Sequence, residues 1–262
     1  MHGENCAKVF IANGSAMSVP ARWHLGGLLI ASILSLDLLA GGADAAPVLF
    51  FDDFDSGASP AWGNESGVWR DTDGLYDATF PDNGPPAYSG VTTLPGLTDF
   101  AIDVDVNSLD DGGVWLRSSY NGGNISGVLL VTGGFGGSFS GLYWHTVVNG
   151  SASGVLGMAG SAGLQGADIE LRVEVVGDTY EAFINGSATP LTTLTTALFS
   201  SGGAGLYDFS PTSGASAPRG QTFDNFRITD LSVQAPEPAT VGLFGLALLG
   251  LGAARRRHPK RN

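Results

Sequence analysis

Two segments alternate between apolar and polar residues, and this pattern restricts the fold more than any other feature of the chain. Residues 100–107 read FAIDVDVN, and residues 169–175 read IELRVEV. Successive side chains of a strand point to opposite faces, so a period of two predicts strands that are covered on one face. Gly177-Asp178 then leads into 179–185, which predicts a two-residue hairpin with glycine first.

The rest of the body repeats short β-like runs between turn residues. No segment there has a convincing helical period, and Asn-Gly pairs such as 121–122 and 149–150 provide turns. Long loops are expected at 133–137, 151–166 and 210–220. Many short strands with turns between them predict an all-β sandwich or barrel. The further strands are expected at 48–54, 68–78, 88–94, 114–120, 127–132, 141–148, 205–209 and 222–233.

Composition supports a folded domain and excludes some functions. The chain has 40 glycines, yet 43% of its residues are hydrophobic, which favours a turn-rich folded protein over a disordered one. Residues 46–235 contain 21 acidic residues, five arginines and no lysine, so we expect no nucleic-acid binding through phosphate neutralisation. The only cysteine is Cys6, so the body has neither a disulfide nor a thiol site.

The N-terminal residues have the pattern of a signal peptide. An apolar run at 25–40 follows basic residues, and Ala43-Asp44-Ala45 provides the small residues of a signal peptidase site. We therefore predict a leader at 1–45 that is cleaved after Ala45. Because the segment before the apolar run is long for a leader, Met17 is an alternative start.

Three features follow one another at the C-terminus. The tripeptide Pro236-Glu237-Pro238 precedes an apolar run at 241–254, which is shorter than the about 20 residues of a permanent span. A basic cluster follows, and such a cluster stays on the cytoplasmic side of a membrane. The chain should therefore be held by its C-terminus at the outer face of the inner membrane. The cluster consists of Arg255, Arg256, Arg257, Lys260 and Arg261.

This order of features resembles the PEP-CTERM sorting signal of exopolysaccharide-producing Gram-negative bacteria. The resemblance implies recognition by an exosortase, cleavage near Pro236-Glu237-Pro238, and release to the envelope or the medium. An ordinary tail-anchor helix is the alternative. The predicted organisation is a leader at 1–45, a β-sandwich at 46–233 and a sorting signal at 234–262.

The body resembles a concanavalin A-like jelly roll of the laminin G type. The resemblance rests on the order of five segments, VLFFDDFDSG, GGVWLR, LRVEVVGDTYEAFINGS, GLYDFS and TFDNFRI. It implies an antiparallel two-sheet sandwich whose first and last strands pair and whose concave face often binds glycans.

Four residues form the candidate ligand face. Trp115 and Arg117 are two apart and should share a face of one strand, while Tyr143 and His145 could lie on a neighbouring strand. The segment GVWLR also resembles a sugar-hydrolase-like family acting on keto-disaccharides, in which an arginine here points into the concave face. In the alternative interpretation, Trp115 and Trp144 pack the core and Arg117 forms a structural ion pair.

Other catalytic chemistry finds little support in the sequence. Family 16 glycosidases of this fold carry E-x-D-x-x-E on one strand, and neither 103–105 nor 168–174 matches that spacing. Both acidic segments have the pattern of solvated outer faces. His145 is the only histidine of the body, so a usual zinc site is excluded, and no Gly-x-Ser-x-Gly elbow is present.

Calcium is the metal that an acidic exported domain would favour, because Ca²⁺ prefers oxygen ligands. Asp52, Asp53 and Asp55 form one candidate cluster, and Asp110 and Asp111 form another. Each cluster supplies too few ligands alone, but laminin G-like domains often hold one Ca²⁺ at a sheet rim, and the resemblance therefore implies such a site.

The leading hypothesis is an exported, exosortase-processed envelope or matrix protein whose sandwich binds exopolysaccharide or another glycan without turnover. A sugar-hydrolase-like enzyme using Arg117, and a structural surface protein without a ligand, are the alternatives.

Overall fold

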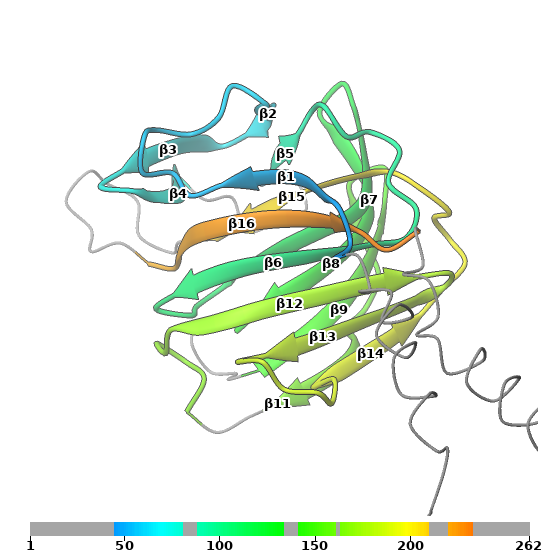
Figure 1. The fold of residues 1–262 in the computed structure, drawn as a ribbon. Coiled ribbons are helices and arrows are strands. Elements are labelled where there is room, and N and C mark those ends of the chain that lie inside the picture. Colours follow the sequence, from blue (N-terminus) through cyan, green and yellow to red (C-terminus); the bar gives the residue numbers. More distant parts are fainter. Residues whose placement is uncertain (1–44, 81–87, 134–140, 161–162, 210–219, 233–262) are drawn as a thin grey trace, which may run out of the picture. The chain divides into compact units, whose positions relative to one another are not determined.

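The computed structural model describes residues 45–80, 88–133, 141–160, 163–209 and 220–232, which all belong to one compact unit, Ala43–Glu237. These residues form sixteen strands and no helix. The strands build two antiparallel sheets of eight strands each, packed face to face, so the predicted all-β sandwich is confirmed (Figure 1). The predicted leader and sorting signal, and the loops expected at 134–137 and 210–219, lie outside the described residues.

The first sheet, here sheet A, is the nearer layer in Figure 1. Its last strand, β16, pairs with both β1 and β4, and all its neighbours are antiparallel. The expected pairing of the first and last strands is therefore confirmed. In spatial order the sheet contains β14 (Thr192–Thr195), β13 (Thr179–Ile184), β12 (Ile169–Val176), β6 (Phe100–Asn107), β16 (Thr222–Asp230), β4 (Leu75–Phe80) and β3 (Val68–Thr72), with β1 (Val48–Asp52) beside β16.

The second sheet, sheet B, lies behind the first in the same view. β9 has the bounds that the sequence predicted, whereas β7 and β8 are longer than expected. In spatial order the sheet contains β10 (Ser151–Ala152), β9 (Gly141–Val148), β8 (Asn124–Thr132), β7 (Gly112–Asn121), β15 (Gly203–Asp208), β5 (Tyr88–Val91) and β2 (Trp62–Ser66), with β11 (Leu156–Gly160) beside β9.

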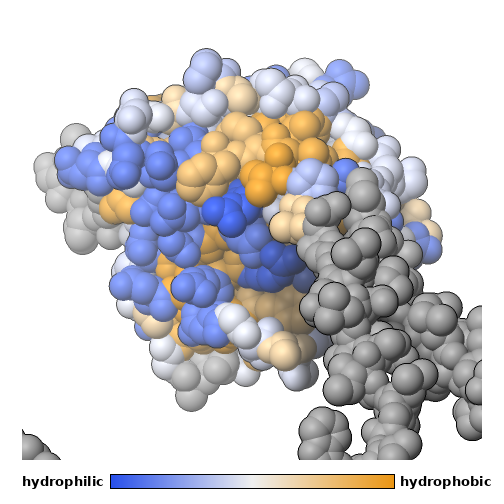
Figure 2. All heavy atoms as spheres, in the orientation of Figure 1, coloured by the Kyte–Doolittle hydropathy of each residue, from blue (hydrophilic) through white to orange (hydrophobic). Residues whose placement is uncertain are grey.

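The apolar members of the alternating segments form the core between the sheets. Ile102 on β6 and Val173 on β12 are fully buried, while Asp103 and Glu174 lie on the outer face of sheet A. Figure 2 accordingly shows a hydrophilic centre on this outer face. Each fully buried Val or Ile side chain contributes about 1.5–3 kcal/mol, so this pattern alone specifies which face turns inward.

An inner aromatic cluster fills the core near β1, β2 and β4. Its rings belong to Phe54, Trp62, Tyr76 and Phe226. The centroid of the Trp62 ring lies 5.0 Å from that of Phe226 and 5.3 Å from that of Tyr76. Two hydrogen bonds hold its polar atoms: Trp62 Nε1 donates to Asp52 at 2.8 Å, and the Tyr76 hydroxyl donates to Glu65 at 3.0 Å. The cluster therefore joins the two sheets through both packing and hydrogen bonds.

Two predictions about strands are wrong, and two strands were not predicted. Residues 68–78 form two strands instead of one, because Asp73 and Gly74 adopt positive φ and reverse the chain. The expected loop at 151–166 contains β10 and β11, which pair with β9. The strands β2 and β14 were not predicted, because their short polar sequences, WGNES and TTLT, have little apolar alternation.

Candidate ligand-binding face

A second group of aromatic residues lies on the outer face of sheet B, away from the core between the sheets. We call this group the outer aromatic face. Its buried rings are Tyr88, Trp115, Tyr143 and Tyr207, and apolar residues of β8 and β9 pack beside them. Its partly exposed members are Tyr120, His145 and Phe209.

Strand pairing explains why these side chains gather. Trp115 on β7 pairs with Leu129 on β8, and Leu129 pairs with His145 on β9. Gly113, two residues before Trp115 on β7, pairs with Tyr207 on β15. Because paired residues share a face, two adjacent rows of this face carry aromatic side chains.

Glycines leave room for the rings to lie on the sheet. A Cβ at Gly205 would lie 2.8 Å from the Tyr88 ring and 2.4 Å from the Ser89 carbonyl oxygen. The Tyr88 ring therefore lies close to the backbone at Gly205. It contacts Trp115 edge-on at 6.1 Å and stacks with Tyr120 at 6.1 Å.

His145 provides the polar group with the clearest geometry on this face. Its ring meets Tyr143 edge-on, with centroids 5.4 Å apart, and its Nδ1 lies 2.9 Å from the Ser153 carbonyl oxygen. A carbonyl oxygen only accepts, so Nδ1 carries the proton and Nε2 of the neutral ring is an acceptor. A ligand hydroxyl could donate a hydrogen bond to this nitrogen.

The buried rings do not form an open stacking platform. Trp115 is fully buried, and Tyr143 exposes only 6% of its surface. Trp115 therefore packs this face, in agreement with the packing role considered for it, although the packing lies outside the core between the sheets. Trp144, in contrast, is buried between the sheets, where its Nε1 donates to Thr192 at 3.1 Å. The accessible part of the outer aromatic face is formed by Tyr120, His145 and Phe209.

The prediction that Arg117 shares a face with Trp115 is wrong. β7 carries one extra residue between Leu116 and Ser119 relative to β8, and Arg117 has a φ of 45°. This β-bulge shifts the alternation by one residue, so the Arg117 side chain points between the sheets. The structure thus brings Trp115, Tyr143 and His145 to one face and separates Arg117 from them.

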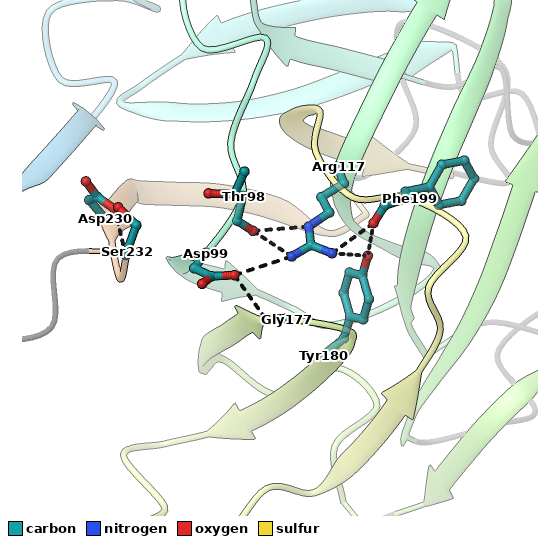
Figure 3. Close-up of polar contacts among 8 residues, drawn as sticks. All are labelled: Thr98, Asp99, Arg117, Gly177, Tyr180, Phe199, Asp230 and Ser232. Carbon is teal, nitrogen blue, oxygen red and sulfur yellow. Dashed lines mark hydrogen bonds and ion pairs between the residues drawn. The ribbon is translucent and has the colours of Figure 1, made fainter.

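Arg117 instead joins four segments of the fold (Figure 3). Its guanidinium donates to the Thr98 carbonyl at 2.7 and 3.1 Å, to the Phe199 carbonyl at 2.8 Å and to the Tyr180 hydroxyl at 3.4 Å. It also lies 3.5 Å from Asp99, whose carboxylate accepts the Gly177 N–H. The side chain is 2% exposed, so these contacts replace its water. This is the structural role that the sequence left open for Arg117.

Asp111 lies next to the outer aromatic face at the start of β7. Burial, and secondly the charge of Asp110, raise the pKa of the Asp111 carboxyl to about 7. Burial, and secondly the charge of Asp111, raise the pKa of the Tyr143 hydroxyl. Asp111 is therefore an ionisable group of the outer aromatic face that changes charge near neutral pH.

The other candidate calcium ligands have structural contacts. Asp52 is buried and accepts hydrogen bonds from the Phe54 and Ser59 N–H groups and from Trp62 Nε1. Asp53 accepts the Asp55 N–H, and Asp110 accepts a bond from Gln165. Among the described residues, no group of three or more His, Cys, Asp or Glu side chains could hold a metal ion.

The acidic outer face of sheet A has the solvated character that the sequence predicted. Arg172 bonds Asp103 at 2.7 Å and Glu174 at 2.8 Å, and all three side chains are about one-third exposed. An open groove of about 520 Å³ lies on the same sheet, lined by Asp105, Asn107, Asp168, Ile169, Glu170 and Asn185.

Sequence reasoning missed two residues of the outer aromatic face and one buried carboxylate between the sheets. Tyr88 and Tyr207 lie on the outer aromatic face. The only signal for them in the sequence is that each lies two residues from a glycine, Gly90 or Gly205, which leaves room for a ring on the same face of the strand. Asp208, at the end of β15, is buried and accepts the Ala78 N–H at 2.8 Å, which links the two sheets. Its burial raises the pKa of its carboxyl well above the usual value.

Comparison with known proteins supports the interpretation of the C-terminus. Residues 234–257 match the PEP-CTERM protein-sorting motif. This motif marks proteins that are exported and sorted to the cell envelope or surface through a C-terminal anchor, so the predicted localisation is confirmed. In the part of the chain that the structure describes, no helix has the length and apolar character needed to cross a bilayer. No curated protein sequence matches the chain.

Solved structures share the fold of the body. A carbohydrate binding module, CBM66 from Bacillus subtilis, aligns with a TM-score of 0.51 and 18% identity, over 65% of this chain and 96% of the module. A protein of unknown function with a galectin-like fold, also from Bacillus subtilis, has a TM-score of 0.50 and 9% identity, over 71% of this chain and 97% of its own. The body is thus a jelly-roll-like sandwich of the kind that the sequence predicted.

Proposed function

We propose that the sandwich is a non-enzymatic glycan-binding module of an exported, exosortase-processed envelope protein. The outer aromatic face carries this proposal, because it gathers aromatic rings on the side of sheet B that is not needed for packing the two sheets. Sugar rings present C–H faces that pack against aromatic rings, and hydroxyls that donate to acceptors such as His145 Nε2. The fold shared with a carbohydrate binding module and the sorting motif are consistent with this role.

The ligand would contact the accessible edge of the face. Tyr120 and His145 are partly exposed and provide one ring face and one acceptor, whereas Trp115 is a buried residue of the same face that contacts Tyr88 edge-on. Exopolysaccharide is the glycan that an envelope protein with this tail would encounter. The expected outcome is retention of an oligosaccharide without turnover.

The test uses the domain from Ala46 to Ala235, which contains the whole described core. It is screened against arrayed glucans, galactans, mannans and fructans, and bound samples are analysed by mass for products. Tyr120→Ala and His145→Ala should each weaken binding about fivefold to tenfold, because one hydrogen bond or ring contact contributes about 1 kcal/mol.

Phe183→Ala is the matched control, since Phe183 is a partly buried aromatic on the outer face of sheet A. It should leave glycan binding unchanged. Equal loss in all three variants, or full binding by Tyr120→Ala and His145→Ala, would contradict the proposal. New products by mass would instead support the enzymatic alternative.

The enzymatic alternative loses the residue on which it depended. In the resembling sugar-hydrolase-like family the arginine points into the concave face, whereas Arg117 here points between the sheets and bonds Thr98, Phe199 and Tyr180. We therefore propose binding without an Arg117-dependent reaction.

Calcium binding at Asp110 and Asp111 is kept as a separate proposal. A bound cation would stabilise the ionised carboxylate of Asp111, which burial disfavours. We expect calcium chloride to raise the melting temperature of the domain and EDTA to reverse the rise. Equal melting temperatures in the two conditions would reject the site.

A further inference from the structure

Both ends of the described sandwich leave it at the same place. β1 begins at Val48, which pairs with Thr229 near the end of β16, and the Asp230 N–H donates to the Pro47 carbonyl at 2.9 Å. In Figure 1, β1 begins and β16 ends at the same side of sheet A. The segments toward the predicted leader and toward the sorting motif therefore depart from adjacent strands.

The same end of sheet A presents exposed apolar side chains. Val48 is 55% exposed, Val176 at the end of β12 is 51% exposed, and Leu198 just after β14 is 53% exposed. Strand register places them at the same end of sheet A, spread across its width, because Val175 pairs with Phe100, Phe100 pairs with Asp230, and Thr179 pairs with Thr195. We call Val48, Val176 and Leu198 the exit rim.

β1 extends this apolar surface along the outer face of sheet A. Leu49 is 39% exposed and Phe51 is 44% exposed, and the Arg227 guanidinium lies 5.1 Å from the Phe51 ring centre. Figure 2 shows an apolar patch at the position of β1, beside the hydrophilic centre of the sheet.

The chain outside the described residues limits how far this rim can move from a membrane. Only residues 233–240 separate Ser232 from the apolar run that begins at Val241. Eight residues span at most about 28 Å, at about 3.3–3.6 Å per residue. While residues 241–254 are embedded, the exit rim therefore stays near the bilayer, which raises the effective concentration of the rim at the lipid surface.

We infer that the exit rim contacts the surface of the bilayer as long as the sorting tail is uncut. Exposed Val and Leu side chains can enter the boundary between headgroups and acyl chains. Asp178 and Asp230 lie at the same end and oppose binding to anionic lipid, so the contact depends on the tether. Cleavage of the tail near Pro238 then removes the tether and frees the domain. This inference rests on the sorting tail and not on the proposed glycan site.

The body has no cysteine, so single probes can be placed without background. The chain from Ala46 to Asn262 is incorporated into vesicles of phosphatidylethanolamine and phosphatidylglycerol, and the floated fraction is measured. Val176→Cys and Leu198→Cys carry an NBD label at the exit rim. Ala188→Cys is the matched control, because Ala188 is exposed in the turn at the opposite end of β13.

We expect blue-shifted NBD emission, quenched by doxyl lipids, at positions 176 and 198 but not at 188. Both signals should disappear when the same labelled chain ends at Ala235. Emission typical of water at 176 and 198 in the tailed chain would overturn the inference. So would a blue shift that grows with protein concentration in the absence of vesicles, because that would show contact with a second copy.

Discussion

The inner aromatic cluster and the outer aromatic face use the same kinds of side chain for different purposes. In the inner cluster each polar atom bonds a group of the fold: Trp62 Nε1 meets Asp52, and the Tyr76 hydroxyl meets Glu65 and Ser89. On the outer face, the rings lie on one sheet only, and two of its polar members, Tyr120 and His145, are partly exposed. Aromatic content therefore does not identify a ligand face until each ring is assigned to a side of its sheet.

β7 contributes to the outer aromatic face and to the space between the sheets, and its bulge decides which of these two sides each residue faces. Trp115 turns to the outer aromatic face, while Arg117 turns inward. Gly202 is required beside the bulge, since a Cβ there would lie 2.3 Å from the Arg117 carbonyl carbon. The comparison predicts that inward changes destabilise the fold and that outward changes affect binding first.

The largest effect should follow Arg117→Leu. The substitution removes the buried donor of the Thr98 carbonyl and of the Tyr180 hydroxyl, and leaves the Phe199 carbonyl with the Tyr180 hydroxyl alone, so we expect a loss of about 3–5 kcal/mol in the free energy of unfolding. Urea denaturation of the 46–235 domain measures it. Arg227→Leu is the control, because Arg227 is exposed and should change stability by less than about 1 kcal/mol. Similar losses for both arginines would remove the distinction between the two sides.

The next effect is the dependence of the free energy of unfolding on pH through Asp111, beside the outer aromatic face. The pKa of Asp111 is about 7 in the folded protein and near 3.8 when the group is exposed, so the fold favours the protonated carboxyl. Stability from this group is therefore complete below about pH 4, decreases as the pH rises to about 7, and is constant above it. The decrease is at most about 1.4 kcal/mol per pH unit for one proton.

Asp111→Asn should remove this contribution, whereas Asp208, whose pKa burial also raises, keeps its own contribution of the same sign. Chemical denaturation between pH 4 and pH 8 compares the two proteins. The variant should have the shallower slope and the higher relative stability at pH 8. Parallel curves would show that the fold does not raise the pKa of Asp111.

The smallest effect should follow Trp62→Phe in the inner cluster. The ring is largely preserved, but Asp52 loses the indole donor at 2.8 Å and keeps the backbone donors of Phe54 and Ser59. We expect a loss of about 1–2 kcal/mol in the free energy of unfolding, with glycan binding unchanged. A variant that folds with full stability but no longer binds glycan would reverse the roles given to the two regions.

Much of the fold could be predicted because burial repeats with the period of a strand. β6 and β12 follow from alternation alone, and β13 follows from the predicted hairpin, in which Gly177 adopts the positive φ that the turn needs. β14 has no comparable signal, since it is held by pairing with β13 and by a hydrogen bond from Thr192 to the Gly157 carbonyl. Contacts between distant segments of the chain leave no local pattern in the sequence.

The candidate site was predicted only in part for a similar reason. Trp115, Tyr143 and His145 share a face, because β7, β8 and β9 pair in register. Counting residues along β7 placed Arg117 with them, but one extra residue reverses the count. A bulge depends on both neighbouring strands, so spacing within one strand cannot reveal it.

The pairing of β1 with β16 also determines how the domain responds to force. The chain enters β1 and leaves β16 at the same end of the two antiparallel strands. A pull between the two termini would load the bond from Asp230 to Pro47 first and then open the remaining bonds one at a time. The first strand would be peeled away like a zipper, at low force, before the load reached the rest of the sandwich.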